Sequence, residues 1–351
     1  MIKRILYTLL IMFPVLASAQ INTDRVMAIG RNALYFEDYV LSIQYFNQVI
    51  NAKPYLSDPY FYRGLAKINL DDFQGAESDC SEAIERNPFV VSAYQVRGLA
   101  RIQQNNFAGA IEDYTKALEF DPENIGVWHN MALCRIRQED YKGAKNDLDK
   151  LIAISPRYTK AYLMRGEVDL KQKDTLAAEK DFGKAIEIDR YDADTWASRA
   201  ILRLQQQRYK DAEADFDHAI RLSTRNSGVY INRALARYHQ NNLRGAMSDY
   251  DIALDIDPNN FIGHYNRGLL RAQVGDDNRA IQDFNFVIEM EPDNMMAIFN
   301  RGLLLDQTGD YKGAIKDYST VINEYPNFLL GYQYRAQARR KIGDVKGADA
   351  D

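Results

Sequence analysis

Several features that define other protein classes are scarce in this sequence. Its 351 residues include only 9 prolines, 20 glycines and 2 cysteines, against 23 tyrosines and 15 phenylalanines. So few turn residues argue against a turn-rich all-β protein, whereas the aromatic side chains suit packed helices. A composition of 46% apolar and 26% charged residues excludes a disordered chain. The first prediction is therefore an all-α protein.

Positive charge is not concentrated anywhere beyond the N-terminus. The formal net charge is −5, and after Lys3 and Arg4 no run of consecutive Lys and Arg is longer than the three residues Arg339-Arg340-Lys341. Proteins that bind nucleic acid need a basic patch or stripe to neutralise phosphates. We therefore expect no nucleic-acid partner.

Motifs of catalysis and of cofactor binding are missing as well. No nucleotide-binding glycine loop, Gly-x-Ser-x-Gly turn or His-Glu-x-x-His helix occurs. The four histidines are not at metal-ligand spacing from one another: His129, His218, His239 and His264. The prediction is a protein without enzymatic activity, metal, cofactor or small-molecule substrate.

The first nineteen residues differ from all that follow. Lys3 and Arg4 precede the apolar stretch 5–16, and Ala17-Ser18-Ala19 has the small-x-small pattern of a cleavage site. The apolar stretch is shorter than the roughly 18 to 20 residues that span a bilayer. We predict a signal peptide over 1–19, cleaved near Ala19, and an extracytoplasmic protein, periplasmic or secreted. An uncleaved N-terminal membrane anchor is the alternative.

A repeat of 34 residues organises the remaining chain. The dipeptides Arg-Gly and Arg-Ala recur at this spacing, or at twice this spacing, from Arg63 to Arg335. Nine full repeats and a partial tenth over 329–351 follow without insertion or deletion. Repeats 1 to 10 begin at Thr23, Ser57, Val91, Ile125, Thr159, Ala193, Ser227, Phe261, Met295 and Leu329.

Most repeats carry side chains of the same size at the same positions. In repeat 3 these are an aromatic at position 4 (Tyr94), a small residue at 8 (Gly98), Ala110 at 20, an aromatic at 24 (Tyr114) and Pro122 at 32. Cys80 and Leu148 at position 24, and Arg190 and Thr224 at position 32, depart from the pattern. The pattern resembles the tetratricopeptide repeat family over nearly the whole chain. The resemblance implies an all-α, right-handed superhelical solenoid of helix-turn-helix repeats over 20–351, which binds other proteins. In each repeat we name the first helix A and the second helix B.

An unusual charge pattern accompanies the repeat. Position 7 of helix A is Arg in most repeats, and position 23 of helix B is Asp. In repeat 1 both are absent, since Ile29 and Tyr45 occupy these positions. We predict a ladder of structural ion pairs between Arg63 and Asp79, Arg97 and Asp113, Arg165 and Asp181, Arg199 and Asp215, Arg233 and Asp249, Arg267 and Asp283, and Arg301 and Asp317. A basic stripe for anionic ligands is the alternative.

The two cysteines are two repeats apart. Cys80 is at position 24 of repeat 2, and Cys134 is at position 10 of repeat 4. Since packed helices lie about 8 to 10 Å apart, the two thiols should be too distant for a disulfide. We expect both to be small buried apolar residues.

The resemblance also suggests where a partner binds, because positions 2, 5, 6, 9, 12 and 13 of helix A tend to line the concave face of such solenoids. Asn recurs at position 6, and its amide can donate to and accept from an extended peptide. This row is similar to the asparagine ladder of the O-linked N-acetylglucosamine transferase repeats. The predicted partner-binding residues are Asn130, Ile231, Asn232, Leu235, Tyr265, Asn266, Leu269, Phe299, Asn300 and Leu303. Alternatively, these Asn are only tolerated polar residues.

The function predicted from the sequence is an exported scaffold or adaptor that holds a partner protein or peptide in a concave groove. Because Asp351 falls in helix B of repeat 10, we expect either a longer protein or a partner that covers the last repeat. Two alternatives follow: a recruiting or regulatory arm of an enzyme whose catalytic domain lies beyond residue 351, and an assembly factor of an envelope complex.

Overall fold

A computed structural model of the chain describes residues 22–351 and contains twenty α-helices and no β-strand within them. The all-α prediction is confirmed. The predicted signal peptide, 1–19, lies outside the described residues. None of the helices in the described part of the chain is long and apolar enough to cross a membrane.

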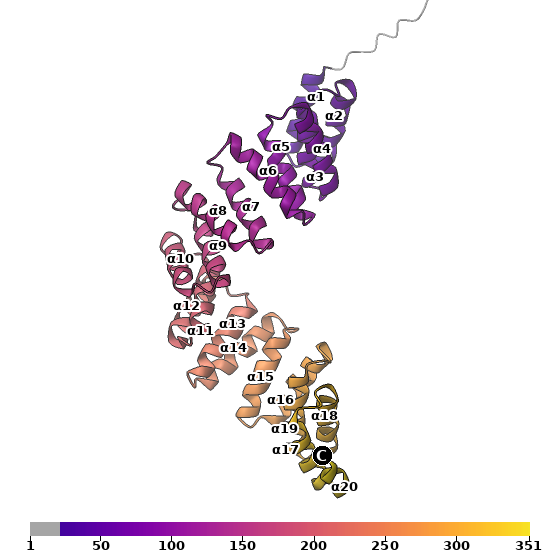
Figure 1. Cartoon of the computed structure of the whole chain (residues 1–351), viewed down its shortest axis with the longest axis vertical. Coiled ribbons are helices and arrows are strands. Elements are labelled where there is room, and N and C mark those ends of the chain that lie inside the picture. Colours follow the sequence, from indigo (N-terminus) through magenta and orange to yellow (C-terminus); the bar gives the residue numbers. More distant parts are fainter. Residues whose placement is uncertain (1–21) are drawn as a thin grey trace, which may run out of the picture. The chain divides into compact units, whose positions relative to one another are not determined.

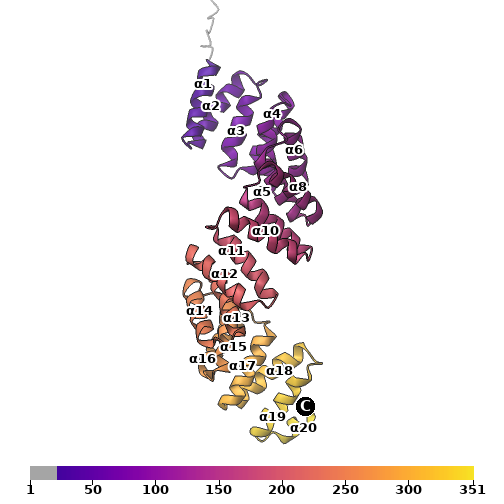
Figure 2. The same ribbon diagram turned by 90° about the vertical axis from the view of Figure 1, so that its left-hand side faces the viewer.

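The first of two compact units ends at Ala161. Successive helices of this unit lie side by side as antiparallel pairs (Figures 1 and 2), and each pair is one repeat. The helices are α1 (Thr23–Tyr35), α2 (Tyr39–Ala52), α3 (Asp58–Ile68), α4 (Phe73–Arg86), α5 (Val91–Gln103), α6 (Phe107–Phe120), α7 (Ile125–Arg137) and α8 (Tyr141–Ile154).

The second unit begins at Tyr162, inside α9 (Thr159–Lys171), and repeats the same arrangement. Its other helices are α10 (Thr175–Ile188), α11 (Ala193–Gln205), α12 (Tyr209–Leu222), α13 (Ser227–His239), α14 (Leu243–Ile256), α15 (Phe261–Gln273), α16 (Asp277–Met290), α17 (Met295–Thr308), α18 (Tyr311–Glu324), α19 (Leu329–Lys341) and α20 (Val345–Ala350). The odd-numbered helices are the A helices, and all of them except α3 begin at the first residue of a repeat.

The turn between helices A and B is built from position 15 and the N-cap at position 16. Asp71 has a left-handed φ of 59°, and Asp72 Oδ1 then accepts a hydrogen bond of 2.9 Å from Gly75 N. This N-cap satisfies one of the backbone N–H groups that lack a partner in the first helical turn. Arg208 and Asp276 stand at the same position, but their side chains make no capping bond.

Close approach of helices A and B explains the small residues. A Cβ atom added to Gly98 would lie 2.7 Å from the Tyr114 ring, so position 8 must remain small where an aromatic fills position 24. Ala110, at position 20, is fully buried beside them. A larger side chain at such a position would overpack the interface, at a cost of roughly 1 to 3 kcal/mol.

The joint between one repeat and the next is fixed by the side chain at position 4. Trp128 Nε1 donates to the carbonyl of Pro122 at 2.8 Å, and Trp196 Nε1 donates to that of Arg190 at 3.0 Å. The contact therefore persists at Arg190, where the usual proline is absent. Each donor reaches six residues back to a backbone carbonyl just beyond the end of the preceding helix B.

Candidate functional site

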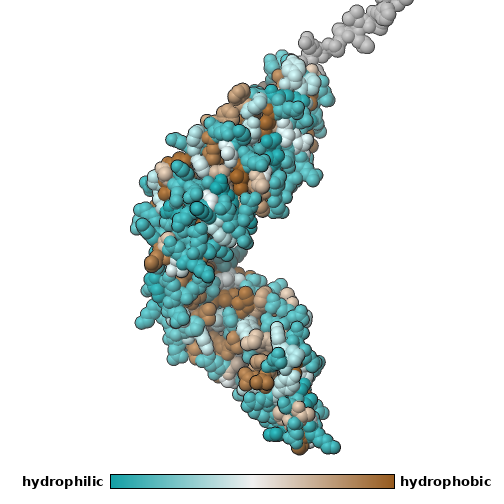
Figure 3. Space-filling model, in the orientation of Figure 1, coloured by the Kyte–Doolittle hydropathy of each residue, from teal (hydrophilic) through white to brown (hydrophobic). Residues whose placement is uncertain are grey.

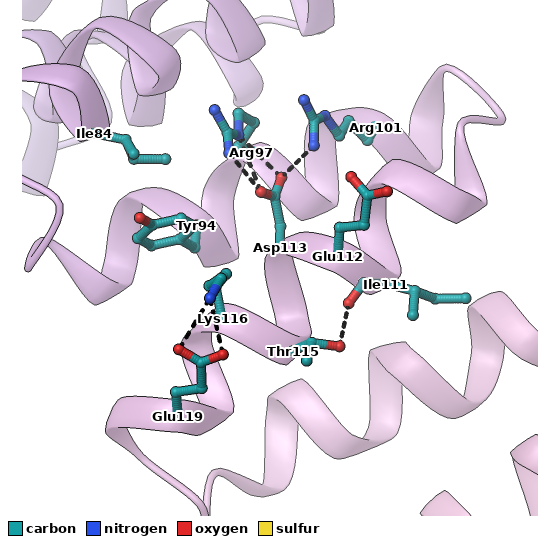
Figure 4. Close-up of a pocket in the computed structure, with 10 residues that line it drawn as sticks. All are labelled: Ile84, Tyr94, Arg97, Arg101, Ile111, Glu112, Asp113, Thr115, Lys116 and Glu119. Carbon is teal, nitrogen blue, oxygen red and sulfur yellow. Dashed lines mark hydrogen bonds and ion pairs between the residues drawn. The ribbon is translucent and has the colours of Figure 1, made fainter.

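The arginines at position 7 pair with the aspartates at position 23 of the same repeat. Arg97 donates from Nη2 to Asp113 Oδ1 at 2.6 Å and from Nε to Oδ2 at 3.0 Å, and Figure 4 shows Arg101 converging on the same carboxylate. The structure brings all seven predicted pairs to 2.5–2.8 Å: Arg63–Asp79, Arg97–Asp113, Arg165–Asp181, Arg199–Asp215, Arg233–Asp249, Arg267–Asp283 and Arg301–Asp317.

The ladder also crosses from one repeat to the next, which the sequence analysis missed. Arg233 Nη1 donates to Asp217 of the preceding repeat at 2.6 Å, and Arg237 Nε donates to Glu213 of that repeat at 2.7 Å. In repeat 10, Arg335 pairs with Asp351 at 2.5 Å, outside the predicted set. Arg233 and Arg237 therefore hold helix A against helix B and also against the preceding helix B.

These contacts leave little free positive charge for an anionic ligand. The side chains of the paired position-7 arginines are only 12–23% exposed, and every one has a carboxylate partner. A pocket of about 650 Å³ borders the repeat 3 pair, but its Lys116 is also paired, with Glu119 at 2.9 Å (Figure 4). The geometry favours a structural role for the ladder over a basic stripe.

Repeat 4 is the exception, because Met131 replaces the first arginine. Arg135 Nε lies 3.0 Å from Asp147 Oδ2, yet this oxygen is buried and lacks a hydrogen-bond partner within residues 22–351. Burial raises the pKa of Asp147 to about 6; Arg135 opposes this rise and Asp140 adds to it. A nearby cation that makes no hydrogen bond to this oxygen compensates only part of the cost of burying the carboxylate.

The predicted asparagine row lies on three A helices of the second unit. Asn232, Asn266 and Asn300 are each half-buried, on α13, α15 and α17. Asn300 Nδ2 donates to Tyr265 Oη at 3.2 Å, a contact between neighbouring repeats. Burial raises the pKa of the Tyr265 hydroxyl, so it stays neutral and can itself donate. Asn130 lies on α7 in the first unit.

Two predicted partner-binding residues are in the core instead. Ile231 is 6% exposed and Phe299 is 9% exposed, and the Phe299 ring packs against Tyr318 and Tyr334. Position 5 therefore faces the neighbouring helices, and these two assignments are corrected. Leu269 is 39% exposed, while Leu235 and Leu303 are half-buried beside the asparagines.

Exposed apolar residues at position 2 extend this face, and the sequence analysis did not single them out. Ile262, Met296 and Leu330 are 51%, 61% and 49% exposed. Figure 3 shows apolar surface gathered over helices α13 to α16. The signal was an apolar residue at position 2 of three successive repeats, where earlier repeats have Asp24, Asp58 or other small and polar residues.

We call the set of residues at positions 2, 6 and 9 of α13, α15 and α17 the repeat 7–9 face. Position 2 is Gly228, Ile262 and Met296, position 6 is Asn232, Asn266 and Asn300, and position 9 is Leu235, Leu269 and Leu303. No member carries a charge. The nearby carboxylate of Asp306 is paired with Lys341 at 2.7 Å. The face therefore offers amides and apolar side chains only.

His218 and His239 stack on aromatic rings, and the two cysteines are buried. His218 stacks on Trp196 at 4.2 Å and His239 on Tyr209 at 4.6 Å. Within residues 22–351 no group of His, Cys, Asp and Glu could hold a metal ion. Both cysteines are buried and unpaired, and burial raises the pKa of the Cys80 thiol to about 12. A thiol with so high a pKa is a poor nucleophile.

The comparisons agree with this architecture. Models of the tetratricopeptide repeat match residues 98–134, 125–158, 159–192, 198–261 and 265–327. A tetratricopeptide repeat protein from Parabacteroides merdae is 21% identical, with a TM-score of 0.54, and the match covers 71% of this chain and 98% of that one. A comparison with curated proteins gave no match.

Two further solved structures have the same fold. The C-terminal part of a repeat protein from Cytophaga hutchinsonii is 17% identical (TM-score 0.56), covering 68% of this chain and 97% of its own. PilF of Pseudomonas aeruginosa is 18% identical (TM-score 0.55), covering 62% and 98%.

The stacked helix pairs of residues 22–351 define a helical repeat protein. The repeat pattern, the family matches and the solved structures then give the family: the chain belongs to the tetratricopeptide repeat proteins.

Proposed function

We propose that the protein is an adaptor that binds an extended segment of a partner protein along the repeat 7–9 face. The observation that carries this proposal is the row of three asparagines at one position of successive A helices. Each amide has both a donor and an acceptor, which matches the alternating N–H and C=O groups of an extended peptide. The exposed Leu269 and Met296 would add apolar contacts.

The absence of charge on this face favours a neutral, apolar-rich segment along most of its length. Burying a charged side chain against apolar groups and amides costs free energy unless a partner charge is present. The ladder arginines do not provide that partner charge, because their own carboxylates already pair with them. This argument distinguishes the face from acidic-peptide sites, in which free cations recognise the ligand.

A photo-crosslinking amino acid at position 269 tests the proposal in the cells that make the protein. Leu176, which is 80% exposed on α10, is the matched control in the same unit. We expect a crosslinked protein at 269 that is absent at 176 and that is lost in the Asn266→Ala, Asn300→Ala double variant. Equal crosslinking in the native and double-variant backgrounds would exclude the asparagine row as the binding element.

We further propose that the protein acts outside the cytoplasm, on the basis of its first nineteen residues. Mass spectrometry of the protein from its own cells tests this. A mature chain that begins near Gln20 supports export with cleavage. A chain that retains residues 1–19 in a membrane fraction supports the anchored alternative, and a retained segment in the cytoplasm rejects both.

A further inference from the structure

A pocket opens at the beginning of α17, next to the asparagine row. Its volume is about 380 Å³, and its lining includes Met295, Met296, Phe299, Tyr325 and Phe328, with Asp293 among them. This volume is at the lower end of the range for small-molecule sites. It suits one large side chain better than a cofactor.

Phe328, at the edge of the pocket, differs from the polar residues at the same position of the four preceding repeats. Position 34 caps the next A helix in neighbouring repeats, as Asn260 Oδ1 does by accepting from Gly263 N at 3.0 Å. Repeat 9 has Phe328 there, and α19 has no side-chain cap. The Phe328 ring instead meets Phe299 edge to face at 5.1 Å. A side-chain cap stabilises the start of a helix, so the aromatic wall of the pocket replaces a stabilising feature.

The remaining walls are accessible and adaptable. Met296 is 61% exposed and Tyr325 is 55% exposed, so both present apolar surface to solvent. Methionine has a flexible, polarizable side chain that adjusts to differently shaped ligands. Met296, Asn300 and Leu303 follow one another at i, i+4 and i+7 and therefore share one face of α17. The pocket thus continues the repeat 7–9 face.

Charge around the pocket is of one sign. Asp293 is exposed and is the only charged residue in the lining. Glu291 precedes it by two residues, and Glu324 is the last residue of α18, directly before Tyr325. The carboxyl end of α18 adds the negative end of a helix dipole. No Lys or Arg lines the pocket, so a positive charge beside the inserted side chain would find a complementary field.

We infer that this pocket takes one large uncharged side chain, aromatic or aliphatic, from the bound segment, and that a Lys or Arg next to it in that segment faces Asp293. The inference rests on the proposed function, since it specifies the sequence of the same bound segment. It adds a specificity that the asparagine row does not have, because amides read the backbone and not the side chains.

Selection from a displayed library of random 12-residue peptides on the full chain tests the inference. We expect enriched peptides to contain a large apolar residue adjacent to Lys or Arg. In a synthetic copy of an enriched peptide, replacing that apolar residue by Ala should weaken binding about tenfold or more in fluorescence anisotropy. Asp293→Lys should shift the enrichment from basic to acidic neighbours.

Two matched variants distinguish binding in the pocket from binding to the asparagine row. Met296→Asp should abolish the tenfold difference between the peptide and its Ala copy, whereas Ile262→Asp, at the same position of the preceding repeat, should preserve it. Melting followed by circular dichroism checks that each exposed-site variant folds.

Two results would overturn the inference in different ways. Peptides that depend on Asn266 and Asn300 but show no apolar-basic pair leave the proposed function intact and reject the pocket. Failure of the native chain to enrich any peptide over the Asn266→Ala, Asn300→Ala double variant rejects the proposed function, and the pocket inference with it.

Discussion

Repeats 4 and 6 each consist of two packed helices, but they differ in the contacts that their arginines make with a buried aspartate. In repeat 6, Arg199 and Arg203 both donate to Asp215, at 2.8 and 2.7 Å. In repeat 4, only Arg135 approaches Asp147, and one carboxylate oxygen is left without a hydrogen bond. Both carboxylates are almost fully buried. The fold therefore tolerates an incomplete ion pair, at the cost of an unsatisfied buried acid.

The difference also involves the repeat before each pair. Arg203 is held on its other side by Glu179, at 3.0 Å. The corresponding residue before repeat 4 is Ile111, and Arg135 lies 3.9 Å from Asp140 of its own repeat instead. Two carboxylates orient Arg203 in a fixed geometry, whereas Arg135 has one buried partner and one exposed partner. The position of an arginine is thus set jointly by two repeats.

The largest expected effect comes from removing the carboxylate of the complete pair. Asp215→Ala leaves Arg199 and Arg203, each less than one fifth exposed, without their shared partner. We expect a loss of roughly 3 to 5 kcal/mol in the free energy of unfolding. Urea unfolding followed by circular dichroism, with hydrogen exchange to locate the change in α11 and α12, measures it. An unchanged unfolding curve would contradict a structural role for the ladder.

A smaller effect of opposite sign is expected for the incomplete pair. Since the folded pKa of Asp147 is raised from 3.8 to about 6, the folded state binds more protons than the unfolded state between these values. Stability contributed at this site therefore falls as pH rises through 6. Asp147→Asn, which mimics the protonated acid, should raise stability at pH 7.5 by on the order of 2 kcal/mol and change it little at pH 3, below both pKa values.

The measurement for Asp147 is the difference in unfolding free energy between the native chain and Asp147→Asn at several pH values. Using the difference removes the contribution of acids with lowered pKa values, such as Glu77, whose hydrogen bonds from Arg101 and Gln104 outweigh its burial. A difference that is independent of pH would show that the pKa of Asp147 is the same in the folded and unfolded states.

The sequence predicted the ion pairs within each repeat, but not the contacts between repeats. Arg at position 7 and Asp at position 23, such as Arg199 and Asp215, recur together in most repeats. The absence of both from repeat 1 supported the prediction that they pair. The contacts that the position-7 arginines make with the preceding repeat use different residue types, such as Ser81, Asp217 and Asn285 at the same position. Without one recurring residue type, they gave no pattern to recognise.

The candidate site was predicted less completely for a geometric reason. Successive residues of a helix are turned by about 100° from each other, so positions 5 and 6 face different surroundings. Asn300 lies on the accessible face, whereas Phe299 is in the core. The sequence identified the helices correctly, but the exact edge of the accessible face depends on how neighbouring helices pack. The pocket beside Phe328 depends on three segments and has no sequence motif.

The smallest effect on stability is expected from exchanging the residues at position 21 of repeats 3 and 5, which precede the two pairs. Ile111→Glu should give Arg135 the second partner that Arg203 has, and Glu179→Ile should remove that partner from repeat 6. Because Glu179 is 23% exposed, losing its pair with Arg203 should lower stability by only about 0.5 to 1 kcal/mol. The new pair at position 111 should contribute a similar amount, which the loss of the packing of Ile111 on the repeat 3 core offsets. Ile111→Glu should also reduce the pH dependence assigned to Asp147, since a better-oriented Arg135 favours the ionised carboxylate. Unfolding at pH 4 and pH 7.5, near the two ends of the pH range in which Asp147 titrates, measures both effects. An unaltered pH dependence would mean that the missing arginine at Met131, and not the orientation of Arg135, sets the pKa of Asp147.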